Sequence, residues 1–480
     1  MSSAFGAGQE LDAYLLAVVT PTVIATIVGD VVYTLLLPEV MADTRRANRW
    51  GVVSWATLGL LALTIAYSLC WLAGVLVFQP GTRGELLLRL GLLTAPLIFL
   101  LSFGSLGATV LIAARRYALA SVRIPLTSLV TVLTFALWTR LASGVTGLAV
   151  SVDVGALVSA LVMFVCLVLL LGAPAAGMSR ADALAFLKRV RGTSAALLTS
   201  AVVAQAATPI ERIIAFAIGP GIVSALNYGR VLVSPPLLVG QSIATAAFPG
   251  FVARRAASHP DRYAVLGRSI SMTVFLLLPM SVLVAGLAPW LVELVYHRGA
   301  FDQEAVRRTT VTGAILAAAL VPIAVGAVVT RFLYAEQKAQ LVARASIAGL
   351  VAYVVLALAL GVGFGYAGMA LASTLSYVLL MCLLIAIAAG GSTAGAGFLL
   401  WRDLARSATA SALAGAAVWA VNVGGGSRQG NLAALVMILI GGSVGAAAFV
   451  VAALALRAPE LTQGLAVARR ALPFHAADQP

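Results

Sequence analysis

The sequence predicts an all-α polytopic membrane protein. Of its 480 residues, 61% are hydrophobic and only 10% are charged, whereas soluble proteins carry about 25% charged residues. The apolar residues form runs of about 20 or more, the length that a helix needs to cross the roughly 30 Å hydrocarbon core. Only helices and closed barrels satisfy their backbone polar groups in lipid, and these runs are too long for barrel strands. The composition excludes a secreted disulfide scaffold, a soluble enzyme and a disordered regulator.

Thirteen candidate spans follow one another between charged breaks. In chain order they are residues 11–38, 51–78, 86–114, 121–139, 145–171, 194–218, 226–250, 269–296, 309–333, 341–363, 366–390, 405–423 and 431–456. We expect four parts: an N-terminal lobe of five spans (1–172), a cytoplasmic amphipathic linker (173–193), a C-terminal lobe of six spans (194–390), and two additional spans with a cytoplasmic tail (391–480).

The formal charge of +14 follows from where the basic residues lie. Loops after odd-numbered spans, together with the tail, hold 22 of the 31 Lys and Arg residues. By the positive-inside rule these loops are cytoplasmic, which places the C-terminus inside. Binding to nucleic acid is therefore not needed to explain the basic balance. The segment 180–191 is a short basic amphipathic helix by pattern, and we expect it to lie against anionic lipid head groups.

A long-range internal repeat supports the two lobes. The 38 residues from Phe5 align without gaps on those from Phe216, and Tyr117-Ala118 recurs as Tyr334-Ala335. Both copies of the first block run in the same direction, as in a parallel repeat about an axis along the membrane normal. A full span precedes the second copy and almost nothing precedes the first. Repeat register and charge asymmetry therefore both predict a further helix before residue 5, which the sequence does not contain.

Charged residues inside the spans are the candidate functional residues, because a charge at mid-bilayer costs about 2.5–3.5 kcal/mol on insertion scales. Adjacent residues point about 100° apart on a helix, so the side chains of Glu211 and Arg212 cannot both be buried on the same side of it. We expect Arg212 to face a wet cavity, and Gln205 to supply a neutral hydrogen bond there or to a neighbouring helix. The charged residues in or near the spans are Asp12, Asp30, Asp153, Glu211, Arg212 and Arg230.

Interior arginines favour an anionic head group, because the guanidinium presents two parallel donors and remains charged. Prolines in corresponding repeated helices, Pro21 and Pro235-Pro236, point to the central site of a transporter or to packing kinks. The sequence therefore predicts two lobes of the same orientation that enclose a positively charged cavity. The three cysteines and three histidines form no ligand cluster.

Four motifs stand out in chain order: FGAGQELDAY with LLLPEV, SALNYGRVLVSPPLLVGQSIATAAFP, YHRGAF and FLYA. They resemble the MurJ/MviN lipid II flippases of the multidrug/oligosaccharidyl-lipid/polysaccharide (MOP) exporter superfamily. The resemblance implies two six-helix lobes around a central cavity, two extra helices that form a groove for the lipid tail, and alternating access. The implied substrate is an undecaprenyl-pyrophosphate-linked peptidoglycan precursor, carried from the inner to the outer leaflet without bond making or breaking.

The resemblance also assigns site residues. Asp12-Ala13-Tyr14 matches the family's Asp-Ala-aromatic block, and Glu211-Arg212 resembles its acidic-basic pair. The sequence departs from the family's pattern in three ways. The first family helix is missing, and Ala25-Thr26 stands where family members often have paired arginines. A further arginine that commonly lines the family's cavity is not matched, and Arg268 is the nearest arginine to that position. Candidate substrate-binding residues are Arg212, Arg230, Glu211, Asp12, Asp30, Gln205, Asn227, Tyr228, Arg123 and Arg268.

Four functions remain open from the sequence. The first is a lipid-linked oligosaccharide flippase in the bacterial plasma membrane. The others are a cation-coupled multidrug or polysaccharide-precursor exporter, a non-transporting scaffold for envelope assembly, and an intramembrane enzyme. Against the enzyme, no His/Ser/Asp set or pair of carboxylates recurs on one helix face of the sequence. We expect no cofactor beyond a coupling cation of unknown identity. The expected partners are the lipid-linked anionic substrate, membrane lipids and the cell-wall synthesis machinery.

Overall fold

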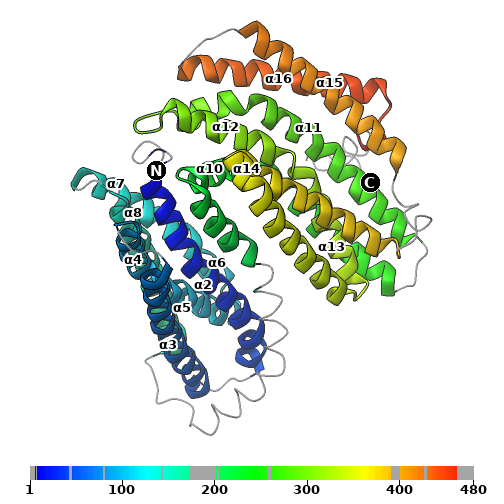
Figure 1. Cartoon of the computed structure of the whole chain (residues 1–480). Helices are drawn as coiled ribbons and strands as arrows, with labels where there is room; N and C mark the ends of the chain where they lie inside the picture. The colour runs from blue at the N-terminus through cyan, green and yellow to red at the C-terminus, as the bar shows by residue number, and fades with distance from the viewer. Residues whose placement is uncertain are drawn as a thin grey trace, which may run out of the picture. The chain divides into compact units, whose positions relative to one another are not determined.

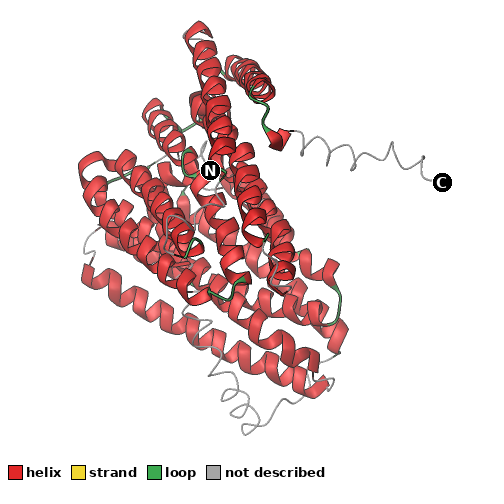
Figure 2. Ribbon diagram, turned by 90° about the vertical axis from the view of Figure 1, so that its right-hand side faces the viewer, coloured by secondary structure: helices red, strands yellow, loops and turns green. Residues whose placement is uncertain are grey.

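The computed structural model describes residues 6, 8–42, 46–78, 82–141, 144–172, 202, 205–256, 261–390, 400–425 and 430–461. In this part of the chain the regular structure is helical and contains no strand (Figure 1, Figure 2). Eleven stretches of the described helices are long and apolar enough to cross a membrane. The predicted all-α polytopic fold is confirmed.

The helices fall into two compact units. One spans Gly8–Phe216, and the other comprises Ala217–Pro480 with the residues before Gly8. Residues 205–216 group with the N-terminal unit, and the predicted lobe boundaries, which place the helix ending at residue 218 in the C-terminal lobe, stay a prediction. One reason for this grouping is that the Nη1 of Arg212 donates a hydrogen bond to the carbonyl of Leu15 in the N-terminal unit. The predicted linker, 173–193, lies outside the described residues.

The described part of the N-terminal unit contains seven helices besides residues 205–216. Their bounds are α2 (Gln9–Ala42), α3 (Arg46–Phe78), α4 (Thr82–Thr94), α5 (Pro96–Ala113), α6 (Tyr117–Ser121), α7 (Arg123–Leu141) and α8 (Val145–Leu171). The predicted span 86–114 is divided between α4 and α5. Pro96 has no N–H to continue the backbone hydrogen bonds of the helix, and its ring crowds the preceding turn. Buried Leu106, Val110 and Leu167 belong to a core that joins α5 and α8.

Seven helices make up the C-terminal unit as far as its residues are described. They are α10 (Ile222–Ala256), α11 (Arg262–Tyr296), α12 (Gln303–Ala317), α13 (Leu320–Ala335), α14 (Ala339–Ala388), α15 (Trp401–Gly425) and α16 (Asn431–Ala455). Phe251 of α10 and Phe332 of α13 meet edge to face, with ring centroids 5.5 Å apart, inside a buried apolar cluster of this unit. The predicted span 309–333 is divided into α12 and α13 at residues 318–319.

Helix α14 contains a break in its middle. Its 50 residues would extend about 75 Å as a straight helix, more than twice the hydrocarbon thickness. At Gly365 the backbone leaves the helical region, with φ 56° and ψ −129°, a conformation that favours glycine. The two predicted spans 341–363 and 366–390 meet at this break.

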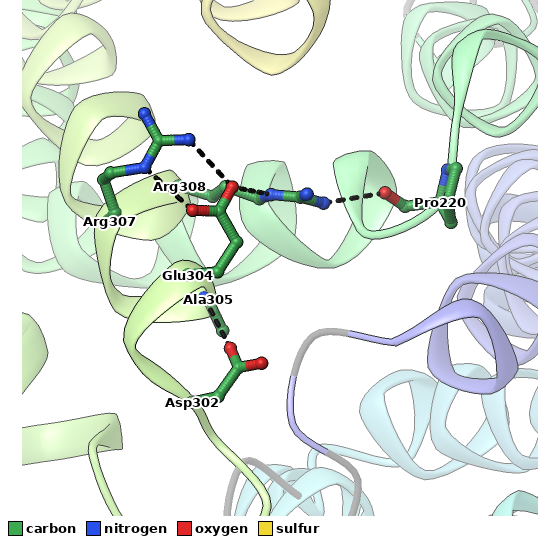
Figure 3. A network of polar contacts seen from close by, with 6 residues as sticks. All are labelled: Pro220, Asp302, Glu304, Ala305, Arg307 and Arg308. Carbon is green, nitrogen blue, oxygen red and sulfur yellow. Dashed lines mark hydrogen bonds and ion pairs between the residues drawn. The ribbon is translucent and has the colours of Figure 1, made fainter.

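The turn between α11 and α12 is held by a polar network (Figure 3). The Asp302 carboxylate caps α12 by accepting a hydrogen bond from the Ala305 N–H at 2.8 Å. Glu304 accepts hydrogen bonds from Arg307 and Arg308, and Arg308 also donates to the carbonyl of Pro220 at 2.9 Å. The start of α12 is thereby tied to the residues just before α10.

Helices α15 and α16 lie side by side (Figure 1), and a buried carboxyl group follows α16. Glu460 is 4% exposed, and its Oε2 has no hydrogen-bond partner among the described residues. Burial raises the pKa of the Glu460 carboxyl and the charge of Asp403 adds to this, while Arg406 opposes it. Asp403 and Arg406 form an ion pair at 3.0 Å.

We expect Glu460→Gln to raise the thermal unfolding temperature in detergent at pH 8. Because the folded-state pKa is raised, the contribution of Glu460 to stability is complete below its unfolded-state pKa, about 4.3, and is lost as pH rises through the folded-state pKa. The advantage of the variant should therefore shrink as the pH is lowered. The exposed Glu10→Gln is the control, and an advantage of Glu460→Gln that is equal at all pH values would contradict this assignment.

Candidate functional site

Six of the residues predicted from the sequence belong to the N-terminal unit. Asp12 and Glu211 are buried, with exposures of 0% and 4%. Arg212 and Gln205 are half-buried, and Arg212 is bonded to the carbonyl of Leu15. The remaining two, Asp30 and Arg123, line a cavity that includes none of the other four.

Arg212 belongs to a set of interacting polar residues that also includes Tyr14 and Asp153. The Tyr14 phenol interacts electrostatically with Asp153 and with Arg212. The Oδ1 of Asp153 is buried and has no hydrogen-bond partner among the described residues. The prediction that Arg212 faces a cavity is not tested by these contacts and stays a prediction.

The other four predicted residues belong to the C-terminal unit. Asn227 and Arg230 are half-buried on α10, and Arg268 is exposed on α11. Tyr228 is buried, with ring centroids 4.8 Å from Tyr296 and 5.4 Å from Phe301. Its hydroxyl lies 3.2 Å from the carbonyl of Gly6, and its own carbonyl accepts a hydrogen bond from Tyr296.

The cavity has a volume of about 310 Å³, near the lower end of small-molecule pockets. It lies entirely within the N-terminal unit, between α2, α5 and α7. Polar and charged side chains from all three helices reach it. Its lining residues are Ala25, Thr26, Gly29, Asp30, Leu101, Ser105, Ala108, Thr109, Ile112 and Arg123.

Arg123 is positioned at the start of α7 by its neighbours. The Ser159 hydroxyl of α8 donates to the carbonyl of Arg123 at 3.1 Å. The side chain runs past Gly104 of α5, where an added Cβ would lie 3.1 Å from the Arg123 Cδ. The absence of a side chain at residue 104 thus makes room for the guanidinium stem.

The guanidinium of Arg123 lines the cavity and makes no hydrogen bond or ion pair with a residue that the structure describes. A buried or half-buried charge without a counter-ion is costly in a membrane protein unless it meets water or a ligand. The five N–H donors of arginine suit carboxylate and phosphate groups. The cavity can therefore receive an anionic group at its α7 side.

Hydroxyl groups line the rest of the cavity, and each donates its hydrogen to the backbone. Thr26 bonds the carbonyl of Thr22 at 2.8 Å, Ser105 that of Leu101 at 3.0 Å, and Thr109 that of Ser105 at 2.9 Å. Their oxygen lone pairs remain available as acceptors. These hydroxyls were missed from the sequence, although Thr22/Thr26 and Leu101/Ser105/Thr109 follow the four-residue spacing of one helix face.

The fold defines the class of protein, a multi-pass helical membrane protein with a polar cavity in its N-terminal unit. A family model described as "Lipid II flippase MurJ" matches residues 1–440. Because this match covers most of the 480 residues, the chain belongs to the MurJ lipid II flippase family, as its motifs predicted. A comparison with curated protein sequences finds no match.

Solved structures share the fold. A lipid II flippase MurJ in an inward closed conformation is 17% identical with a TM-score of 0.77, and the alignment covers 95% of each chain. An inward-facing MATE-family multidrug resistance transporter of the MOP superfamily is 15% identical with a TM-score of 0.64, covering 79% of this chain and 90% of that one. A MOP superfamily transporter from Pyrococcus furiosus is 14% identical with a TM-score of 0.54, covering 78% and 86%. At these identities the likeness shows the fold alone.

Proposed function

We propose that the protein moves lipid II, an undecaprenyl-pyrophosphate-linked peptidoglycan precursor, from the inner to the outer leaflet of a bacterial plasma membrane by alternating access. Membership of the MurJ family supports this function. The observation that carries it in this chain is Arg123, whose guanidinium lines a cavity within the N-terminal unit without a protein counter-ion among the described residues. A positive charge presented in this way fits an anionic head group.

Further residues would act with Arg123 during transport. The predicted substrate-binding residues Arg212, Arg230 and Arg268 would add positive charge along the path of the head group. The proposal keeps the C-terminus cytoplasmic, following the distribution of Lys and Arg. It also implies that cell-wall synthesis enzymes supply and consume the lipid on opposite sides of the membrane.

A cation-coupled exporter is the second candidate function. Asp30 lines the same cavity as Arg123, and Asp153 has a buried oxygen without a hydrogen-bond partner among the described residues. Carboxylates inside a membrane frequently carry protons or cations in transporters. This function predicts transport of organic cations rather than of an anionic lipid.

Proteoliposomes that contain the purified protein and fluorescent lipid II test the first function. Loss of fluorescence after addition of a membrane-impermeant quencher reports the leaflet in which the label lies. We expect protein-dependent exchange of lipid II between leaflets and no exchange of an equally labelled phosphatidylcholine. No exchange of lipid II above protein-free liposomes would contradict the proposal, and uptake of ethidium in its place would favour the cation exporter.

A further inference from the structure

We propose that residues 458–461 form a proton-controlled strap, which is docked on α11, α15 and α16 while the Glu460 carboxyl is protonated and is released when that carboxyl ionises. The strap follows α16 in the chain and belongs to the C-terminal unit. In the proposed orientation it lies on the cytoplasmic side, so its state would follow the cytoplasmic pH. Such a strap would respond to pH whatever the protein transports.

The backbone reverses its direction between α16 and the strap. The Ala458 N–H donates to the carbonyl of Ala453 at 2.9 Å, and the Arg457 N–H donates to that of Leu454 at 3.1 Å. This pair of bonds is the Schellman motif, which ends many helices and usually has glycine at the position of Arg457. Arg457 has a φ of 52°, which is unfavourable for a residue with a Cβ. The reversal therefore depends on the contacts that the strap makes after it.

Apolar contacts hold the strap against three helices. Ala458 is buried, and Leu461 packs on the same apolar cluster. This cluster includes Phe275 of α11, Ala410 of α15 and Phe449 of α16, and the ring centroids of the two phenylalanines are 5.1 Å apart. The three helices pack against one another (Figure 1). The docked strap thus joins the end of α16 to its two neighbours.

Glu460 is buried within this packing. Its side chain is 4% exposed, and its Oε2 has no hydrogen-bond partner among the described residues. The charges of Asp403 and Arg406 on α15 act on it. These two residues pair with each other at 3.0 Å, so Arg406 is already engaged and Asp403 repels a second carboxylate. A protonated Glu460 avoids both this repulsion and the cost of burying a charge.

Among the described residues, the other two helices add no charge that acts on Glu460. Helix α16 contains no titratable residue. The titratable residues of α11 are Arg262, Tyr263 and Arg268 toward its start, and Glu293 and Tyr296 toward its end. Arg268 is exposed. Water therefore stabilises an ionised Glu460 better than the docked position does.

The docked strap holds the proton of Glu460 more tightly than the released strap. Burial raises the pKa of the Glu460 carboxyl in the docked state, and the charge of Asp403 adds to this, while Arg406 opposes it. In the released strap the pKa returns to about 4.3. Docking is therefore strongest below the released-state pKa and weakens as the pH rises through the docked-state pKa. The strap is expected to open as the pH rises.

Tryptic cleavage after Arg457 measures release of the strap in the purified full-length protein. Arg457 is exposed, but a protease needs an extended segment on both sides of the bond, and the residues that follow are docked. The rate of cleavage therefore reports the population of the released state when docking is fast. A synthetic peptide with the sequence of residues 454–461 corrects for the effect of pH on trypsin, and mass spectrometry identifies the cleaved bond.

We expect the cleavage rate of the protein, relative to the peptide, to increase at least about tenfold between about pH 6 and about pH 9. Tenfold is the change that one pH unit produces in the ratio of two states that differ by one bound proton.

Variants separate the proton on Glu460 from other effects of pH. Glu460→Gln keeps a neutral side chain, so its strap should be cleaved slowly at every pH. Asp403→Asn removes the repelling charge and frees Arg406 to pair with Glu460, so the increase with pH should shrink. Glu10→Gln, at an exposed carboxyl of the N-terminal unit, is the matched control and should show the wild-type increase. Ala458→Asp places a charge in the apolar cluster and calibrates the released state, with fast cleavage at every pH.

Three results would overturn the proposal. The first is an equal relative rate at both ends of the pH range, and the second is an increase that persists in Glu460→Gln. The third is cleavage of the wild type as fast as that of Ala458→Asp at every pH, because the strap would then not be docked. If Glu460→Gln does not fold, Asp403→Asn decides in its place, and an undiminished increase in that variant rejects the strap.

Discussion

Arg123→Gln is expected to slow lipid II exchange in proteoliposomes by about tenfold to a hundredfold, the effect of losing one charge-assisted hydrogen bond. The guanidinium borders the cavity of the N-terminal unit and has no hydrogen bond or ion pair with a described residue. Its removal therefore breaks no described ion pair, and the variant should reach the membrane in normal amount. The loss should appear in transport rather than in folding.

Arg344→Gln is the matched control for this prediction. Arg344 lies in the first turns of α14 and its side chain is exposed. Exchange at the wild-type rate is expected. Equal rates in the wild type and in Arg123→Gln would remove the cavity from the transport path, and equal losses in both arginine variants would point to a general effect of charge.

Gly368→Ala is expected to lower the free energy of unfolding by about 3 kcal/mol, at the upper end of the range for overpacking. A Cβ at this position would lie 1.9 Å from the carbonyl oxygen of Leu360. The neighbour is backbone and cannot rotate away as a flexible side chain would. The two parts of α14 would have to separate at the break, which can be measured by equilibrium unfolding in mixed detergent micelles.

Gly363→Ala provides the control within the same helix. No atom lies within 4 Å of a Cβ added there, and its φ is not positive. The substitution should be neutral or stabilise the protein by up to about 1 kcal/mol through helix propensity. If Gly368→Ala were as stable as Gly363→Ala, the close approach of residues 360 and 368 would not exist in the folded protein.

Most of the helices could be predicted from the sequence, because the bilayer imposes a minimum length on every apolar run. The starts and ends of α2, α3 and α8 lie close to predicted boundaries for this reason. The predicted spans 86–114 and 309–333 each correspond to one membrane-length stretch, but the short interruption inside each could not be predicted, since an apolar run with an internal break has the same composition as an unbroken one. Pro96 was the available signal for the first division.

The candidate site was predicted only in part. Asp30 was recognised because a charge in an apolar segment stands out, whereas Arg123 was included only as an arginine at the cytoplasmic end of a helix. Thr26, Ser105 and Thr109 were not, because hydroxyl side chains occur throughout membrane helices and bond locally to their own backbone. Which charges share a cavity depends on how α2, α5 and α7 pack, and no pattern along a single helix contains that information.

The interruption of α14 at Gly365 divides the mechanical behaviour of that helix. A continuous ladder of backbone hydrogen bonds acts as a stiff rod, and the non-helical residue at Gly365 interrupts it. The two segments of α14 are therefore held together by packing across the break, as between Leu360 and Gly368, rather than by one continuous helix. Amide hydrogen exchange would then show two separate zones of protection on either side of residue 365.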